Sequence, residues 1–390
     1  MTVFLGCGFA AKYREGGGNF SVPLQWMLGL RQLKLDAIWL ELLPGSGNRK
    51  IDKGKIDNFI RQMRAHGFAR RYGLLYQKSP SDSHELGEIE CIGISERELR
   101  DRLAGPNTLL NLSHSIHPPL LLEFERRIFC DLDPSEIFYW MTQMEMGQST
   151  HHHFWTIGLN WRGRDCRLPR STRLRHGSGG QAINWRTFFP LVDTKYFQAQ
   201  ARPRANKFTT IGQWYWGGAV EVAGEFPDLS KKHAFERYVD LPGRVANARF
   251  ELAMNINATD PERGRLQKHG WHIVDPHRVA LTPKLYRRYL SGAAGEFTAI
   301  KGVDVAWKTG WLSDRAAAFL ALGRPVITED TGAAQYLPLD SGFQFVRGVD
   351  QAAQAAERVL RNWTHWSKIA RRTAVEVFDS AKNLRQILDL

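Results

Sequence analysis

Strand-like and helix-like segments alternate along most of this 390-residue chain, and this alternation constrains the fold more than any other feature. Short apolar runs, such as "VFL" at 3–5 and "AIWLELL" at 37–43, are separated by segments with helical spacing of apolar residues, such as 21–34. Strands and helices that alternate in this way are typical of a parallel, doubly wound sheet. We therefore expect an α/β fold.

The alternation occurs in two series. It lapses between about 162 and 207, and a second series begins with "KFTTIGQWYW" at 207–216. The chain is also longer than one hydrophobic core usually supports. We expect two Rossmann-like domains that face each other across a cleft, at 1–190 and 191–369, with the C-terminal helix at 370–390 returning to the first.

Charge and cysteine usage narrow the function classes. The formal net charge is +13, which favours a polyanionic partner such as nucleotide phosphates, nucleic acid or an acidic membrane face, although charge alone identifies no partner. The four cysteines lie far apart, which is typical of reduced thiols and not of a zinc site or a disulfide scaffold. The amino terminus resembles a strand and not a signal peptide, and no segment has the roughly 20 apolar residues of a membrane-spanning helix. We expect a cytoplasmic protein without a membrane span, and peripheral membrane contact stays open.

The stretch "TGWLSDRAAAFLALGRPVITEDTG" at 309–332 carries the strongest functional signal. We expect a strand "GVDVAWK" at 302–308, a helix that starts after the cap residue Ser313 and ends at Gly323, and a strand at 326–328. Ligands of open α/β sheets bind beyond the carboxyl ends of the strands, and a helix start suits a phosphate. Cations near this helix start would add charge: Lys301, Lys308, Arg315 and Arg324. The alternative is that Asp314 already satisfies the helix dipole and Ser313 is only a cap.

Several segments resemble GT-B glycosyltransferases. "GEFTAIKGVDVAWKTGWLSDRAAAFLALGRPVITEDTG" at 295–332 is similar to the donor-domain segment of bacterial members, and "GGGNFSVPLQWMLGLRQLKLDAIWLE" at 16–41 is similar to their opening glycine turn, helix and strand. The resemblance implies transfer of a sugar from a nucleotide-diphosphate sugar as co-substrate, with no other cofactor. The first domain would bind the acceptor and the second the donor. The implied donor-binding residues are Gly17, Gly18, Lys301, Lys308, Gly310, Trp311, Ser313, Asp314, Arg315, Asp330, Thr331 and Gly332.

The chain departs from the retaining branch of that family in one respect. That branch has two glutamates ahead of the "GRPV" motif, and the aligned positions here are Gly310 and Ala318. Carboxylate contacts to the donor would have to come from elsewhere, such as Asp314 or Asp330. The stereochemical outcome therefore stays open.

An inverting mechanism would need a general base from the first domain. His114, Asp131 and His153 are the catalytic candidates, because each lies at the end of an expected strand. The structural alternative is that each caps a helix or a turn. The histidine triplet at 151–153 also suggests a metal site, but a third ligand at a recognisable spacing is missing, so we expect no metal. Tryptophans near the domain crossover would either line a cleft or belong to the core: Trp155, Trp161, Trp185, Trp214 and Trp216.

Three functions stay in competition. The sequence favours a metal-independent glycosyltransferase in which lysine, arginine and a helix start stabilise the leaving diphosphate. The charge of +13 would also serve a glycosyltransferase with a nucleic-acid acceptor. The missing glutamates allow a non-catalytic, basic nucleotide- or nucleic-acid-binding protein of the same fold. The acceptor itself, whether a small molecule, a glycan or nucleic acid, is not indicated.

Overall fold

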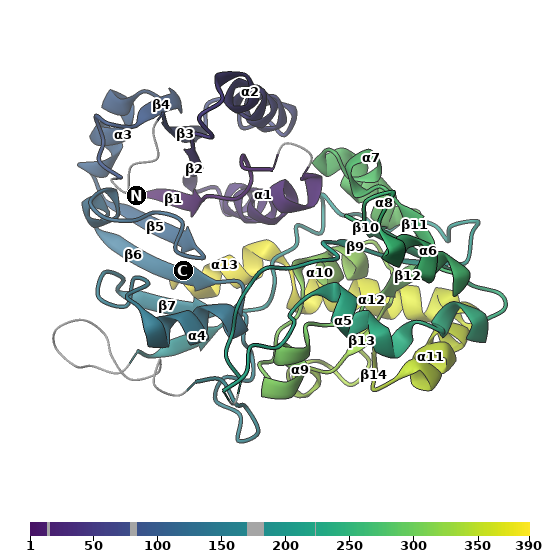
Figure 1. Ribbon diagram of the computed structural model, residues 1–390. Helices are drawn as coiled ribbons and strands as arrows, with labels where there is room; N and C mark the ends of the chain where they lie inside the picture. Colours follow the sequence, from purple (N-terminus) through teal and green to yellow (C-terminus); the bar gives the residue numbers. More distant parts are fainter. Residues whose placement is uncertain (14–15, 79–83, 170–182, 223) are drawn as a thin grey trace.

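A computed structural model describes residues 1–13, 16–78, 84–169, 183–222 and 224–390 (Figure 1). Within these residues the chain forms two α/β domains, each built around its own sheet. The first sheet has the order β4-β3-β2-β1-β5-β6-β7-β8 and is parallel except where β4 pairs antiparallel with β3. Its strands are β1 (Thr2–Cys7), β2 (Asp36–Pro44), β3 (Tyr72–Gln77), β4 (Glu90–Gly93), β5 (Asn107–Leu112), β6 (Arg126–Asp131), β7 (His153–Thr156) and β8 (Trp185–Thr187).

The second sheet is parallel in all its described pairs and has the order β11-β10-β9-β12-β13-β14. Its strands are β9 (Lys207–Gly212), β10 (Arg249–Met254), β11 (His272–Val274), β12 (Gly295–Phe297), β13 (Val326–Glu329) and β14 (Phe343–Val346). Strands such as β1, which is buried along its whole length, are apolar on both faces because helices cover both sides of a parallel sheet.

Helices cover both sheets. Those of the first domain are α1 (Gly17–Gln32), α2 (Arg49–Ala65), α3 (Glu96–Leu103) and α4 (Pro134–Gln143). Those that follow β9 are α5 (Lys231–Phe235), α6 (Pro261–Lys268), α7 (Pro276–Val279), α8 (Pro283–Ser291), α9 (Gly302–Trp307), α10 (Asp314–Ala321), α11 (Val349–Arg361), α12 (Trp363–Val377) and α13 (Ser380–Leu388).

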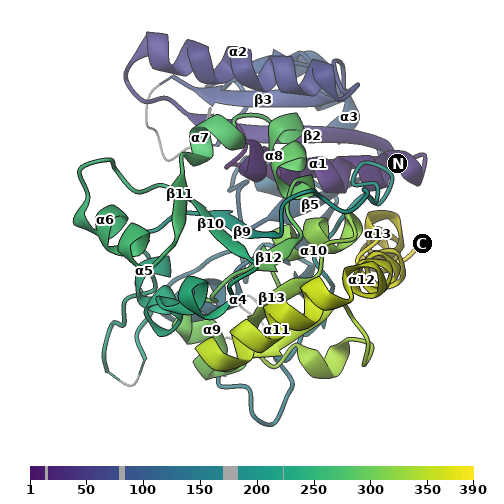
Figure 2. The same cartoon turned by 90° about the vertical axis from the view of Figure 1, so that its right-hand side faces the viewer.

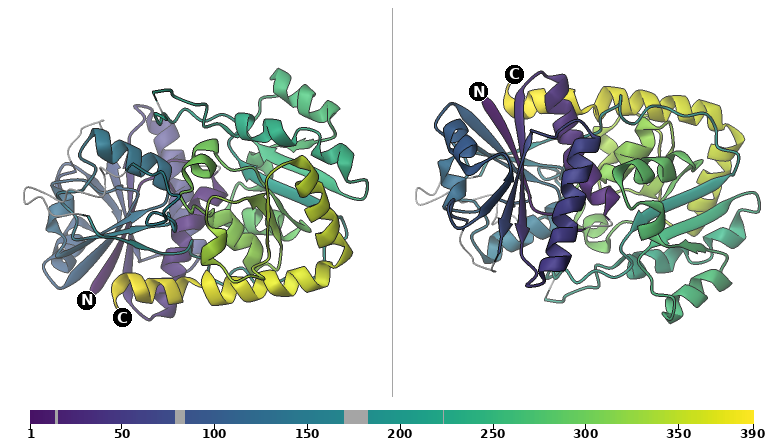
Figure 3. Two further views of the ribbon diagram at one scale, coloured as in Figure 1. Left: turned by 90° about the horizontal axis from the view of Figure 1, so that it is seen from below. Right: turned by 90° about the horizontal axis from the view of Figure 1, so that it is seen from above.

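The end of the chain returns to the first domain. Helix α12 lies along the second domain, and α13 then packs against α1, so the two termini lie near each other (Figure 3). Leu384, Ile387 and Leu388 of α13 are buried in the hydrophobic core of the first domain. The last helix therefore fixes the two domains to each other.

One expected element is wrong. The segment 302–308, expected as a strand, contains the helix α9. Val303 and Trp307 are its buried apolar residues, and their spacing of four places both on one face of a helix. Helix α10 starts and ends where the sequence indicates: the Ser313 hydroxyl accepts from the N–H of Ala316 at 3.0 Å, and Gly323 follows in the left-handed region at φ +72°.

No helix among the described residues is long and apolar enough to cross a membrane.

Candidate functional site

A cavity of about 350 Å³ lies between the two domains, where strands of both sheets reach their carboxyl ends. We call it the interdomain cavity. The first domain contributes the start of α1, and the second contributes the ends of β9 and β10, helices α7 and α8, and the start of α10. It is lined by Tyr13, Gly16, Gly17, Gly18, Asn19, Val22, Ile211, Gly212, Gln213, Asn255, Pro276, His277, Ala280, Tyr286, Trp311, Ser313, Asp314 and Arg315. Six of the predicted donor-binding residues thus come together: Gly17, Gly18, Trp311, Ser313, Asp314 and Arg315.

The glycine turn forms the wall that belongs to the first domain. The N–H of Gly17 donates to the carbonyl of Ala280 in the second domain at 2.9 Å, and α1 lies beside α8 (Figure 2). A Cβ atom at Gly17 would lie 2.3 Å from that carbonyl oxygen and 2.5 Å from the carbonyl carbon and oxygen of Thr282. Glycine is therefore required here because backbone meets backbone across the two domains.

The start of α10 forms the opposite wall. Ser313 is buried and caps the helix, which leaves the N–H of Arg315 without a hydrogen-bond partner among the described residues. Such an N–H group carries part of the positive end of the helix dipole. Asp314 lies at the same helix start, and burial raises the pKa of its carboxyl to about 6. The wall therefore offers a backbone donor beside a carboxyl group that titrates near neutral pH.

Arg315 is not a free cation. Its guanidinium donates to the fully buried carboxylate of Glu296, to the carbonyl of Ile211 at 2.7 Å and to the hydroxyl of Thr298 at 3.3 Å. Its charge is balanced by Glu296, so the cavity is less positive than the sequence indicates. Arg315 instead ties the start of α10 to the ends of β9 and β12.

Lys231 of α5 is a second cation near this network, and sequence reasoning missed it. Its ammonium group contacts the carbonyl of Ala299 and lies 3.4 Å from the hydroxyl of Thr298, which Arg315 also contacts. Burial, followed by the nearby charge of Arg315, lowers the pKa of Lys231 to about 7. No sequence signal could have linked Lys231 to α10, because more than 80 residues separate them.

The remaining predicted donor residues lie at the junction of the domains and outside the cavity lining. Lys301 bridges the domains, with its ammonium group 2.5 Å from the carboxylate of Asp133 and 2.9 Å from that of Glu136. The others belong to two second-domain turns that meet Asn160 of the first domain: Lys308, Gly310, Asp330, Thr331 and Gly332. The Asn160 side chain donates to the carbonyl of Lys308 at 2.8 Å, and a Cβ at Gly310 would lie 2.3 Å from the Asn160 nitrogen.

Two of these junction residues have clear structural partners. The carboxylate of Asp330 accepts from the N–H groups of Gly332 at 2.9 Å and Ala334 at 3.2 Å, and the hydroxyl of Thr331 donates to the carbonyl of Trp311 at 2.8 Å. They shape the turn after β13. Their predicted contact with a donor stays a prediction.

Arg324 does not supply charge to the cavity, contrary to the sequence expectation. Its side chain is fully buried, donates to the carbonyls of Gln200, Ala201 and Ser291, and lies over the ring of Trp363 at 5.1 Å. It joins the start of the second domain to α8 and α12.

None of the three predicted bases lines the interdomain cavity. His114 follows β5 but turns back onto the face of the sheet, with its ring 5.9 Å from that of Phe129 and 5.7 Å from that of His151. Burial, followed by the charges of His117, His151 and His84, lowers the pKa of His114 to about 3. Although these histidines lie close together, the described residues contain no group of three His, Cys, Asp or Glu arranged to hold a metal ion.

Asp131 and His153 lie at opposite ends of two neighbouring strands, β6 and β7. Asp131 ends β6 at the carboxyl edge but is fully buried; its carboxylate accepts from the hydroxyl of Thr156 at 2.5 Å and from the N–H of Asp133 at 2.7 Å. Burial raises its pKa to about 7. His153 is the first residue of β7 and pairs in register with Ile128 in the middle of β6, three residues before the carboxyl end of that strand.

Most of the tryptophans near the domain crossover are buried: Trp155, Trp161, Trp185 and Trp214. The first three also border a second cavity. Trp216 is 43% exposed and donates to Glu136 at 2.8 Å. Trp311 lines the interdomain cavity and donates to the carbonyl of Leu132 across the junction at 3.3 Å.

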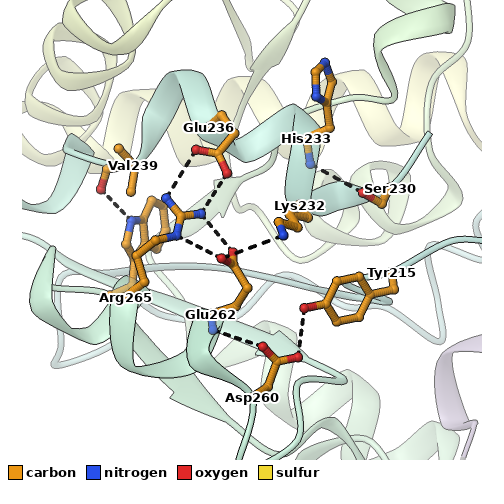
Figure 4. A network of polar contacts seen from close by, with 10 residues as sticks. Tyr215, Ser230, Lys232, His233, Glu236, Val239, Asp260, Glu262 and Arg265 are labelled. Carbon is orange, nitrogen blue, oxygen red and sulfur yellow. Dashed lines mark hydrogen bonds and ion pairs between the residues drawn. The ribbon is translucent and has the colours of Figure 1, made fainter. Parts of the chain in front are cut away.

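A network of polar contacts joins the segment after β9 to the helices α5 and α6 of the second domain, outside the cavity lining (Figure 4). The guanidinium of Arg265 in α6 lies between two carboxylates, 2.8 Å from Glu236 and 2.8 Å from Glu262. Tyr215, two residues after the lining residue Gln213, donates to Asp260 at the start of α6 at 2.8 Å. These contacts hold the segment after β9 against α6.

Comparisons with known proteins identify the fold. No protein-family model matches the sequence, and no curated protein is significantly similar to it. Solved structures do match: HepE of Anabaena in complex with UDP (TM-score 0.57), an α-glucosyltransferase in complex with UDP and a 13-mer DNA containing an A:G mismatch (0.56), and sucrose-phosphate synthase from Thermosynechococcus elongatus (0.53). Each is 10% identical, and each alignment covers 100% of this chain and 98% of the other. Identity this low shows the fold alone, and the chain has the two-domain GT-B fold that the sequence predicts.

Proposed function

We propose that this protein is a glycosyltransferase that moves a sugar from a nucleotide-diphosphate sugar, bound in the interdomain cavity, to an acceptor hydroxyl. The observation that carries the proposal is the convergence of the Gly16–Gly18 turn of one domain and the Ser313–Arg315 helix start of the other on one cavity at the carboxyl ends of both sheets. Ligands of α/β sheets bind at this edge. Structural neighbours solved with UDP or UDP-glucose support a nucleotide-sugar donor.

The leaving diphosphate would lie at the start of α10. Negative charge grows on it as the glycosidic bond breaks, so groups already in place to receive that charge lower the barrier. The backbone N–H of Arg315 supplies a fixed hydrogen-bond donor. The side chains of Arg315 and Lys231 both contact the hydroxyl of Thr298, at 3.3 and 3.4 Å, and so place two cationic groups next to this helix start. In this proposal protein groups alone stabilise the leaving group.

Of the two carboxylates proposed to replace the missing glutamates, Asp314 is the better candidate. It lines the cavity, whereas the carboxylate of Asp330 is held by Gly332 and Ala334 and does not line it. We propose that Asp314 accepts a hydrogen bond from a hydroxyl of the donor.

A thermal-shift panel with UDP, GDP, ADP and TDP tests the donor site. A nucleotide present at 100 times its Kd stabilises the protein by about 2.7 kcal/mol, which for a chain of this size corresponds to a shift of a few degrees. A protein that has lost its donor site would shift with none of the four.

The role of Arg315 is tested by a charge-balanced double variant, Glu296→Gln with Arg315→Ala. Arg315→Ala alone would leave Glu296 buried and unpaired, so a loss of activity could reflect misfolding. The double variant is expected to keep its melting temperature within a few degrees and to lose at least tenfold in sugar transfer, while Arg347→Ala, an exposed arginine of the same domain, stays unchanged. Wild-type transfer in the double variant would remove Arg315 from the donor site.

A nucleic-acid acceptor is the second candidate, favoured by the net charge of +13 and by the structural neighbour solved with DNA. Phosphate contacts make the affinity for nucleic acid fall steeply with salt: the logarithm of the binding constant falls against the logarithm of the salt concentration with a slope of about −0.9 per contacted phosphate. A titration of duplex and single-stranded DNA between about 50 and 200 mM salt separates the candidates. A shallow slope would argue against nucleic acid.

A further inference from the structure

A second cavity, of about 680 Å³, lies at the other end of the domain junction, where β7 and β8 end. Among the described residues it shares no lining residue with the interdomain cavity. Tyr336 of the second domain closes one side, and its hydroxyl donates to Asn160 at 3.0 Å. We call it the arginine-lined cavity. Its lining is Trp155, Leu159, Trp161, Arg162, Asn184, Trp185, Arg186, Thr187, Tyr336 and Gln386.

Its lining is basic. The described lining contains no Asp or Glu, and its charged residues are Arg162 and Arg186. Asp389, outside the lining, pairs with Arg186 at 2.7 Å, and Arg162 donates to the side-chain oxygen of Asn184 at 2.6 Å. Each guanidinium lies over an indole ring, Arg162 at 4.7 Å from Trp161 and Arg186 at 5.1 Å from Trp155. Stacking of this kind fixes the plane of a guanidinium and leaves N–H groups at its edge for an oxyanion.

The remaining polar groups of the lining are neutral. They are the side-chain amides of Asn184 and Gln386 and the hydroxyl groups of Thr187 and Tyr336. The Nε1–H groups of the buried Trp155 and Trp185 are inaccessible and do not open into the cavity. A ligand that carries both hydroxyl groups and acceptor oxygens suits such a lining.

The shape favours a saccharide over nucleic acid. A base that stacks needs an open aromatic face. Here Trp155 and Trp161 are at most 7% exposed, and a guanidinium lies over each ring, so the cavity presents guanidinium groups and no open ring face of these two residues. A cavity of 680 Å³ is in the size range of sites for small ligands.

From these observations we infer that the arginine-lined cavity binds an anionic saccharide, one whose ring carries a phosphate or a carboxylate. This inference does not rest on the proposed glycosyltransferase function.

The test measures binding by isothermal titration calorimetry to the full chain without nucleotide. The probes are glucose, glucose 6-phosphate, glucuronate, inorganic phosphate and a single-stranded ten-nucleotide DNA. We expect glucose 6-phosphate or glucuronate to bind at least tenfold more tightly than glucose and than phosphate alone, and comparison of the two distinguishes a phosphate from a carboxylate. Failure of both acidic sugars to bind, or tighter binding of the DNA, would overturn the inference.

Two variants locate the site. Arg186→Gln and Arg162→Gln are each expected to weaken acidic-sugar binding at least tenfold, and having both keeps the test valid if one fails to fold. Arg244→Gln is the matched control: Arg244 pairs with Asp350 at 2.6 Å and is 45% exposed, much as Arg186 pairs with Asp389 at 2.7 Å and is 50% exposed. Equal affinity in all three variants would place the sugar elsewhere.

The two proposals fail separately. A protein that binds nucleoside diphosphates but no acidic saccharide retains the proposed donor site and loses this inference. A protein whose acidic-sugar binding depends on Arg162 and Arg186, but which binds no nucleotide, retains the second site and loses the proposed transferase function.

Discussion

Gly17→Ala is the substitution that most directly tests whether the interdomain cavity depends on close contact between the domains. The added Cβ would lie 2.3 Å from the carbonyl oxygen of Ala280, whereas ordinary contacts begin at 3.4 Å. The difference, 3.4 − 2.3 = 1.1 Å, must come from movement of backbone, because no flexible side chain is among the nearest atoms. That movement also strains the hydrogen bond between Gly17 and Ala280.

The expected magnitude follows from this overlap. Overpacking of a well-packed contact costs about 1–3 kcal/mol. The cost applies to the closed arrangement and vanishes once the domains separate, so the ratio of closed to open molecules falls by about 5- to 150-fold. Because the donor would contact both walls, its affinity should fall by up to the same factor. Each domain keeps its own core, so the melting temperature should change little.

Calorimetric titration with the nucleoside diphosphate chosen by the thermal-shift panel measures this effect. Gly18→Ala adds the same methyl group to the same wall, 3.3 Å from the ring of Tyr286 and not against backbone, so it measures what a methyl group in the cavity does without the clash between the domains. Gly264→Ala, with nothing within 4 Å of its Cβ, controls for helix propensity. Affinity of Gly17→Ala within twofold of wild type, or equal to that of Gly18→Ala, would refute the reasoning.

Two further predictions concern buried charge. Lys301→Met removes the cation that pairs with Asp133 and Glu136 at the junction and should destabilise the protein by about 3 kcal/mol. Lys78→Met, at an exposed ion pair, should cost less than about 1 kcal/mol. Equal shifts of the urea midpoint in the two variants would contradict this prediction. Burial lowers the pKa of His114 to about 3, so the folded protein keeps this ring neutral while the unfolded chain binds a proton below about pH 6.5. The contribution of His114 to stability is therefore complete above that pH, and about 2 kcal/mol of it is lost by pH 5. His114→Phe should gain about 2 kcal/mol relative to wild type between pH 7.5 and pH 5. The test compares the two proteins, because buried carboxyls such as Asp131, with its pKa raised to about 7, change the stability of both in the opposite direction. If the stability difference between His114→Phe and wild type is the same at pH 7.5 and pH 5, the buried histidine does not cause the loss of stability.

The sequence predicts the fold because each strand and helix carries its own signal. Helix α10, for example, has a serine cap, an apolar interior and a glycine stop, and it begins and ends where those residues stand. The segment at 302–308 was misassigned because Val303, Val305 and Trp307 fit both a spacing of two and a spacing of four. Only packing decides between them, and packing buries Val303 and Trp307 while Val305 stays partly exposed.

The candidate site is less predictable because its properties arise from pairs that lie far apart in the chain. The sequence shows that Arg315 follows a helix cap, but not that Glu296 neutralises it or that Lys231 lies next to it. It also leaves open whether Gly17 serves a loop or a close approach, since the contact with Ala280 depends on how the domains meet. Residue types indicate which groups are available, and the tertiary structure decides which of them remain free to act.

This balance of charge bears on how the proposed reaction would be driven. A cavity with several unpaired cations would bind the diphosphate of the intact donor almost as strongly as the departing one, and uniform binding does not accelerate the chemical step. Here Glu296 already balances Arg315. Lys231, which lies outside the cavity lining and shares Thr298 with Arg315, has a pKa of about 7, so it is only partly protonated before a donor binds. As charge develops on the leaving group, the ammonium form of Lys231 and the fixed N–H at the start of α10 both become more favourable. A site built in this way responds to the change in charge during bond cleavage more than to the charge that the donor brings with it.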